Sequence, residues 1–149
     1  MSRPNKAAGA SVTQRLIDWP AAQAAAGAAV QAAAAMGARV NVALVDASGV
    51  LAAFLRMPGA PLHSVDIAID KAYTAASFGL PTARWHEELQ THSAAVREGI
   101  VRCPRFVAFG GGLPIVERGV LIGAIGVSGG REDQDDAIAR AGCAALNLD

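Results

Sequence analysis

Lys71 is the residue whose type and position in this chain of 149 residues most directly suggest chemistry. At about 100° per residue, residues 64–78 have the spacing of a helix with one polar face. That polar face consists of Asp66, Asp70, Tyr73 and Ser77. Lys71 falls on the opposite arc, whose neighbouring members are Ile67, Ala68, Ala75 and Phe78. Lysine is rarely buried without a partner, and burial lowers its pKa.

Two interpretations of Lys71 remain open from the sequence. In the first, a desolvated Lys71 is a base or nucleophile, or pairs with an acidic ligand. In the second, the side-chain stem packs among apolar groups while the ammonium reaches water or Asp46, at the end of a neighbouring hairpin. The helical pattern alone favours neither.

Arg56 and His63 lie seven residues apart, on either side of a Pro- and Gly-containing loop that leads into the helix of Lys71. Functional residues concentrate in such exposed junctions, and a guanidinium is suited to clamping a carboxylate. We therefore predict that both contact an acidic ligand, and His63 is a second candidate catalytic residue. His86 and His92 are six residues apart, which predicts solvated side chains rather than a metal-binding pair. The sequence has no C-x-x-C-H, which excludes covalent c-type haem attachment.

Two glycine-rich corners are further candidates for ligand binding, because bare backbone N–H groups could line a site there. Their members are Gly110, Gly111 and Gly112, and then Ser128, Gly129 and Gly130. A triple glycine loses much backbone entropy on folding, which indicates positive φ angles or the close approach of a ligand or a neighbouring subunit, unless the run is only a tight turn. Asp135 follows the second corner on the inward face of a predicted helix, with Ile138. A buried carboxylate must be hydrogen-bonded, so we predict that Asp135 caps nearby backbone amides.

The elements that must position these residues form one predicted domain over 18–149, after a flexible N-terminal arm over 1–17. Apolar periodicity, caps and turn residues predict helices at 21–36, 64–78, 83–93 and 131–146, and strands at 39–46, 50–56, 105–109, 113–117 and 120–127. Asp18 is the predicted cap of the first helix and Thr82 that of the third, and residues 94–104 are a predicted polar connection. The order α-β-β-α-α-β-β-β-α predicts an α+β fold with a five-stranded antiparallel sheet covered by helices. The first two strands are nearly continuously apolar, which predicts central positions in the sheet.

Composition limits the partners. Hydrophobic residues make up 52% of the chain and charged residues 17%, so we expect part of the surface to be covered in a homo-oligomer. Thirteen basic and thirteen acidic residues balance, which indicates no nucleic-acid partner. No apolar run is long enough to cross a membrane, and residues 1–15 lack a signal peptide's apolar core. Cys103 and Cys143 form no disulfide framework or metal knuckle, so we expect reduced thiols, no metal site and a cytoplasmic location.

Several blocks of this sequence resemble a known family. They are VALVDASG at 42–49, Arg56-Met57 with Gly59-Ala60, DKAYTAA at 70–76, GGLPI at 111–115, GAIGVSGG at 123–130, QD at 134–135 and IARAG at 138–142. Together they are similar to the haem-binding family named for the glycolate-operon protein GlcG and for HbpS, over roughly residues 20–146. The resemblance implies a small oligomeric domain with a profilin-like or PAS-like sheet that binds haem or a similar planar or acidic ligand. It also implies an accessory role among catabolic enzymes, including those for aromatic compounds.

We therefore expect non-covalent binding of haem, or of a similar planar molecule with acid groups, in a pocket near an oligomer interface. Arg56, His63 and Lys71 would contact the ligand, and the two glycine corners would supply backbone amides. The alternative is a small cofactor-free catabolic enzyme, of isomerase, tautomerase or hydrolase type, that acts on an unsaturated carboxylic acid. Lys71 would be its base or nucleophile and Arg56 its carboxylate clamp. A ligand-free assembly or sensor module is the third interpretation.

Overall fold

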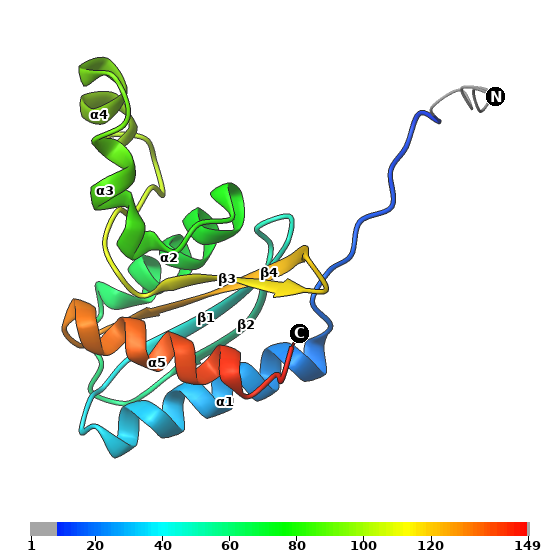
Figure 1. Ribbon diagram of the computed structural model, residues 1–149. Helices are drawn as coiled ribbons and strands as arrows, with labels where there is room; N and C mark the ends of the chain where they lie inside the picture. The colour runs from blue at the N-terminus through cyan, green and yellow to red at the C-terminus, as the bar shows by residue number, and fades with distance from the viewer. Residues whose placement is uncertain (1–8, 149) are drawn as a thin grey trace.

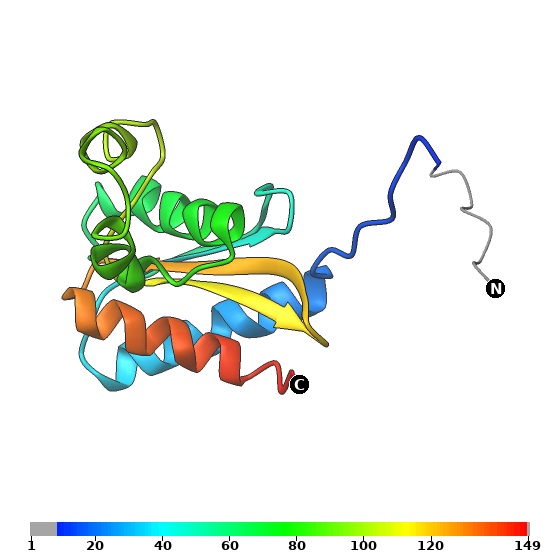
Figure 2. The ribbon, with the colours of Figure 1, turned by 45° about the horizontal axis from the view of Figure 1, so that its top comes forward.

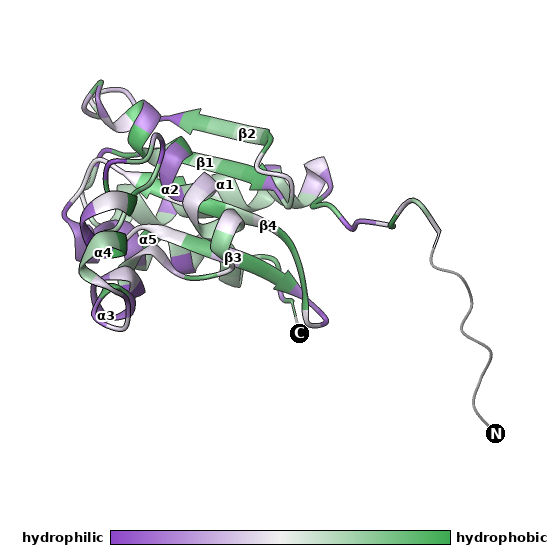
Figure 3. Ribbon diagram, turned by 90° about the horizontal axis from the view of Figure 1, so that it is seen from above, coloured by the Kyte–Doolittle hydropathy of each residue, from purple (hydrophilic) through white to green (hydrophobic). Residues whose placement is uncertain are grey.

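Four antiparallel strands form the sheet at the centre of the domain. The computed structural model describes residues 9–148, and the strands are β1 (Asn41–Asp46), β2 (Leu51–Arg56), β3 (Gly112–Glu117) and β4 (Val120–Ser128). Their order across the sheet is β2-β1-β4-β3, which Figure 3 shows from above. β1 and β4 are central, and β2 and β3 form the edges.

Helices cover both faces of this sheet (Figures 1 and 2). α1 (Trp19–Ala35) and α5 (Glu132–Ala144) lie side by side on one face, and α2 (Ser64–Phe78) lies on the other. Beyond α2 come a 3₁₀ turn, η1 (Thr82–Arg84), and two short helices, α3 (Trp85–Leu89) and α4 (Ala94–Ile100). In Figure 1, α3 and α4 project away from the sheet. No helix in the described part of the chain is long and apolar enough to cross a membrane.

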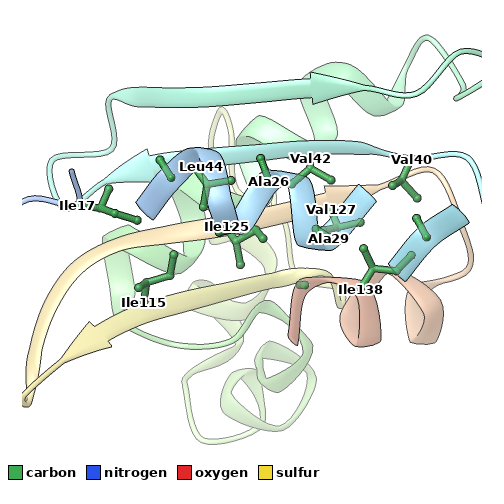
Figure 4. Packing of buried hydrophobic residues seen from close by; sticks show 14 of the residues in the cluster. Ile17, Ala26, Ala29, Val40, Val42, Leu44, Ile115, Ile125, Val127 and Ile138 are labelled. Carbon is green, nitrogen blue, oxygen red and sulfur yellow. The ribbon is translucent and has the colours of Figure 1, made fainter. Parts of the chain in front are cut away.

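The larger part of the core lies between the sheet and the α1–α5 layer (Figure 4). Asp18 begins α1 as predicted, because its Oδ1 accepts a hydrogen bond from Trp19 N at 2.8 Å. The buried positions of α1 are all alanine, and its small side chains allow close contact with α5. Larger branched residues of the sheet and of α5 pack against these alanines, among them Leu44, Ile125 and Ile138.

The second core region lies between α2 and the sheet, and close backbone approach shapes it. Ala68 and Ala72 of α2 lie fully buried against Gly126 of β4. A Cβ atom on Gly126 would overlap the carbonyl oxygen of Ala68. Gly126 therefore lets α2 lie unusually close to β4, which brings the side chain of Lys71 to the end of that strand.

The α+β class and the predicted α2 are confirmed, but the prediction of a fifth strand is wrong. Residues 105–109 form no strand, because Arg105 has a φ of 68° in the left-handed region and follows Pro104. The side chain of Thr74 fixes this segment, since its Oγ1 donates to Arg105 O at 2.9 Å and accepts from Val107 N at 3.1 Å. The apolar run Phe106–Phe109 thus packs as a loop above α2, and the predicted element order is wrong at this point.

Two further predictions need correction. β2 is an edge strand rather than a central one, and Leu51 and Leu55 are 46% and 40% exposed. The helix predicted at 83–93 is instead η1 followed by the five-residue α3, and the predicted polar connection at 94–104 contains α4. Thr82 does not cap that helix, because its hydroxyl instead accepts a hydrogen bond from Gly112 N at 2.8 Å.

Part of the predicted N-terminal arm lies outside the described residues, namely 1–8. Its end contacts the domain: Ile17 is buried and donates its N–H to Ile122 O at 2.8 Å. Arg15 forms an ion pair with Glu117, and Gln14 shares a hydrogen bond with Ser48. The predicted division of the chain into an arm and one domain stays a prediction.

Candidate functional site

The Lys71 side chain runs into the interior from α2, and its ammonium is 1% exposed. Nζ donates to Val127 O at 2.8 Å and to Asp135 Oδ2 at 3.1 Å. The ring of Phe109 lies over it, with its centroid 5.0 Å from Nζ. The three N–H groups of the ammonium thus have a carbonyl, a carboxylate and a ring face as neighbours. The second interpretation of Lys71, in which the ammonium reaches water or Asp46, is wrong, because the side chain is buried and bonds to Val127 and Asp135 instead.

Asp135 completes this buried centre from the first turn of α5. Its second oxygen, Oδ1, accepts from Gly130 N at 2.9 Å, so the predicted capping of a backbone amide is confirmed. Burial lowers the pKa of Lys71, and the Asp135 charge opposes that shift. Burial likewise raises the pKa of Asp135, against the opposing effects of Lys71 and the Gly130 amide. The buried surroundings disfavour either charge alone, so the two charges depend on each other and on their hydrogen bonds to Val127 O and Gly130 N.

The triple glycine lies directly against Lys71. Gly111 has a φ of 122°, and a Cβ atom there would lie 2.5 Å from Val127 O and 2.7 Å from Lys71 Nζ. A Cβ atom on Gly112 would lie 2.6 Å from the carbonyl oxygen of Lys71. The predicted positive φ is confirmed at Gly111, and the groups that lie close to it belong to this chain rather than to a ligand or a neighbouring subunit.

Side chains of the same chain already accept hydrogen bonds from three of the candidate backbone amides. Gly110 N donates to Glu132 Oε1 at 2.7 Å, and Gly112 N donates to the hydroxyl of Thr82. The third is the amide of Gly130, which Asp135 caps. A ligand that used these donors would have to displace those side chains. A hollow of about 430 Å³ opens beside Gly110, with a lining of Ala83, Arg131, Glu132, Asp133 and Asp136 that is mostly acidic.

Arg56, Ser128 and the buried Asn41 form a row across three strands. Asn41 pairs with Arg56 of β2 and with Ser128 of β4, and paired residues of antiparallel strands point to the same face. That face is the one that α2 covers. Asn41 is fully buried, its Nδ2 donates to Pro61 O at 3.4 Å, and its Oδ1 has no partner among the described residues. Sequence reasoning missed Asn41, because an isolated asparagine at a strand start gives no pattern.

Arg56 and His63 lie at the exposed N-terminal end of α2, which we call the α2 mouth (residues 56–63). The guanidinium of Arg56 donates to Ala60 O at 2.7 Å and so closes the loop. His63 occupies the N-cap position, is exposed, and makes no capping hydrogen bond with its side chain. Leu62 beside it is 79% exposed. The structure thus brings Arg56, His63 and Ser128 to one end of the sheet. Lys71, Gly111 and Gly112 form a buried centre next to it, since Lys71 binds the carbonyl of Val127, the residue before Ser128.

A second region that the sequence did not predict lies at the other end of α2. The rings of Phe78, Trp85 and Phe106 meet edge to face, with neighbouring centroids 4.8–6.1 Å apart. Two hollows, of about 290 and 350 Å³, both border Phe78 and Ile100. The guanidinium of Arg105 stacks 3.6 Å from the centroid of Tyr73 at the edge of the smaller one. We call these two hollows the aromatic cleft.

The remaining histidines and possible metal ligands are scattered. His86 and His92 are both exposed, and they lie within α3 and beyond its end rather than on one helix. His92 Nε2 is 3.5 Å from Glu88 Oε1. Within residues 9–148, no three His, Cys, Asp or Glu side chains gather closely enough to hold a metal ion.

The family whose model matches this chain is described as haem degrading protein HbpS-like, and the match covers residues 17–144. This chain belongs to the HbpS-like family. Its fold is close to that of Streptomyces reticuli HbpS, solved as a double mutant, which is 36% identical over 98% of both chains with a TM-score of 0.81. It is also similar to a structure described as a PduOC:haem complex, with 33% identity, 90% of this chain and 97% of the other covered, and a TM-score of 0.82.

Relatives within the HbpS-like family occur in longer proteins as well. The corrinoid adenosyltransferase PduO of Salmonella typhimurium is 36% identical over 81% of this chain, and this chain spans only 36% of its length. An uncharacterised 15.0 kDa protein of Citrobacter freundii is 37% identical over 73% of this chain and 80% of its own. GlcG of Escherichia coli is 35% identical over 60% of this chain and 63% of its own length. The GlcG/HbpS-type resemblance read from the sequence is confirmed.

Proposed function

We propose that this HbpS-like protein binds haem, or a similar planar molecule with acid groups, without a covalent bond. The observation that carries the proposal is the haem complex of the PduOC relative, which matches 90% of this chain at 33% identity. The family itself is described as haem-degrading. We place the ligand at the α2 mouth, near an interface between copies of the chain.

The residues of the α2 mouth suit such a ligand. Arg56 is exposed and always charged, so it would bind a propionate or another carboxylate. The N-terminus of the 15-residue α2 adds a partial positive charge at the same place. His63 would offer a ring nitrogen to an iron centre, and Leu62, 79% exposed, would pack on the face of a planar molecule. Haem would supply the redox-active iron, while the chain holds and orients it.

Polar groups of the sheet beneath the mouth would support the residues that contact the ligand. Ser128 is buried at the end of β4, and Asn41 beside it carries the carboxamide oxygen that has no partner among the described residues. Lys71 and the glycine corners would support the site from within, because Lys71 donates to the carbonyl of Val127, the residue before Ser128. Direct ligand contact by Lys71 or by the amides of Gly110, Gly112 and Gly130 would require their present partners to move.

The enzymatic alternative is favoured by the burial of Lys71, which is 1% exposed, because burial lowers the pKa of its ammonium. To act as a base or nucleophile, Lys71 must first pass its proton to a neighbour, and Asp135 Oδ2 lies 3.1 Å from Nζ. A substrate would then have to reach Nζ past Phe109, which is 45% exposed and lies over it. We propose this as the second function. It predicts turnover of an unsaturated carboxylic acid that Lys71→Met abolishes while analogue binding persists.

An absorbance titration with haemin tests the first function. Binding would give a Soret band that saturates with protein, and acidified organic solvent would extract all of the haem because no covalent bond holds it. A protein of similar size that has no haem site sets the background affinity. A spectrum that stays that of free haemin would rule the proposal out.

A further inference from the structure

The smaller hollow of the aromatic cleft lies at the C-terminal end of α2, the end opposite the α2 mouth. Its volume is about 290 Å³, and its walls include the rings of Tyr73 and Phe78 from α2 and of Phe106 from the loop beyond α4. Small-molecule sites occupy about 300–1,000 Å³, so this hollow is at the small end of that range. It suits a compound with one ring rather than a macrocycle such as haem.

Arg105 is fixed in place at the edge of this hollow. Its backbone has a φ of 68°, which is uncommon for a residue other than glycine, and its carbonyl oxygen accepts from Thr74 Oγ1 at 2.9 Å. Its side chain is 42% exposed, yet Nε donates to Asp70 Oδ1 at 3.0 Å and one face of the guanidinium lies 3.6 Å from the ring centroid of Tyr73. Backbone conformations of this kind cluster at ligand-binding sites, where the surrounding contacts hold them.

The part of the guanidinium that remains free can bind an anion. Asp70 takes only Nε, and the two terminal nitrogens of Arg105 have no partner among the described residues. Of the described residues that line the hollow, Arg105 alone carries a charge. An arginine offers two parallel N–H groups to a carboxylate, and aromatic walls favour a ring that packs edge to face or offset against them.

We propose that the smaller hollow of the aromatic cleft binds a single-ring aromatic carboxylate. The ring of the ligand packs against Phe78, Phe106 and Ile100, and its carboxylate accepts hydrogen bonds from the terminal nitrogens of Arg105. The site shares no residue with the α2 mouth. It goes beyond the proposed binding of haem, and none of its tests contains haemin.

The first test is isothermal titration calorimetry of the wild type with three probes. Benzoate carries both the ring and the charge, benzamide keeps the ring without the charge, and acetate keeps the charge without the ring. We expect benzoate to bind at least tenfold more tightly than either of the other two, because only benzoate satisfies both the aromatic walls and Arg105.

A matched pair of arginine variants tests the position of the carboxylate. Arg105→Gln removes the guanidinium at the hollow and should weaken benzoate binding at least tenfold. Arg118→Gln is the control, because Arg118 is also exposed and also has a left-handed φ, of 51°, but lies in the β3–β4 turn. Arg56→Gln removes the guanidinium at the α2 mouth. Both of these should bind benzoate as the wild type does, and circular dichroism checks that every variant is folded.

Cys103 gives a second measurement that needs no arginine variant. Its thiol is exposed and it borders the smaller hollow, so a bound ligand should shield it. In a Cys143→Ala background, saturating benzoate should slow the reaction of Cys103 with a disulfide reagent severalfold, whereas benzamide and acetate at the same concentration should not.

Benzoate that binds no more tightly than benzamide or acetate, or that leaves Cys103 fully reactive at saturation, would overturn the proposal. Unchanged benzoate binding by Arg105→Gln, or a loss confined to Arg56→Gln, would do so as well, since the carboxylate would then lie elsewhere. Haemin binding at the α2 mouth could survive each of these results. Conversely, a protein that binds benzoate as described but no haemin would keep this site and lose only the proposed function.

Discussion

The ammonium of Lys71 and the carboxylate of Asp135 lie 3.1 Å apart inside the domain, where they join α2 to the first turn of α5. Their side chains are 1% and 4% exposed. Each also holds a backbone group, Val127 O for the lysine and Gly130 N for the aspartate. The pair thereby fixes the turn between β4 and α5 to α2, which lies on the other face of the sheet from α5.

Removing one charge of this pair should destabilise the fold strongly. We expect Lys71→Met to lower the free energy of unfolding by about 3–5 kcal/mol, because it leaves a buried carboxylate without its counter-ion. Urea unfolding followed by circular dichroism measures this. The double variant Lys71→Met/Asp135→Asn removes both charges and keeps an acceptor for Gly130 N, so it should recover at least half of the loss. A single variant within about 1 kcal/mol of the wild type would contradict this view of the pair.

Gly111 should tolerate no side chain. Gly111→Ala would combine a left-handed φ of 122° with a Cβ atom 2.5 Å from Val127 O, so we expect a loss of more than about 3 kcal/mol. Gly119→Ala is the control, because Gly119 has a φ of 77° but no atom near the added carbon. That variant should lose only the backbone strain, about 1 kcal/mol. Equal losses in thermal or urea unfolding would mean that the contact with Lys71 does not matter.

Cys143 should make stability depend on pH in the alkaline range. Burial raises the pKa of its thiol from 9.0 to about 11. Between these values the thiol loses its proton in the unfolded chain and keeps it in the folded chain. The contribution of the buried thiol to the free energy of unfolding is therefore complete below pH 9.0 and is lost as the pH rises through 11. Relative to Cys143→Ala, the wild type should lose about 2 kcal/mol of unfolding free energy from pH 8 to 11. Cys103→Ala, at an exposed thiol, should show no such trend, and a flat difference for Cys143→Ala would refute the prediction.

Much of the fold could be predicted from local patterns. The helix of Lys71, the two hairpins and the cap at Asp18 follow from helical spacing, alternating runs and turn residues, all of which act over a few residues. The apolar run at 106–109 misled the prediction, because the side chain of Thr74, about thirty residues away, determines its path. The apolar character of β2 likewise gave no sign that it is an edge strand.

The candidate site was predictable residue by residue but not as an arrangement. Helical spacing placed Lys71 and Asp135 on inward faces, yet no pattern related the two, since 64 residues separate them. The triple glycine pointed to a close approach without showing that Lys71 is the approaching group. The aromatic cleft escaped notice because Phe78, Trp85 and Phe106 come from three different segments.

We propose that haem binds this HbpS-like protein at the α2 mouth, and paired haemin titrations of two histidine variants distinguish this site from any other. His63→Ala removes the imidazole at the N-terminus of α2, whereas His86→Ala removes an exposed imidazole on α3. We expect the wild type and His86→Ala to give the same Soret maximum, and His63→Ala to shift it or to weaken haemin binding at least tenfold. A Soret band identical in all three proteins, with equal affinity, would contradict His63 as the ligand and the α2 mouth as the haem site.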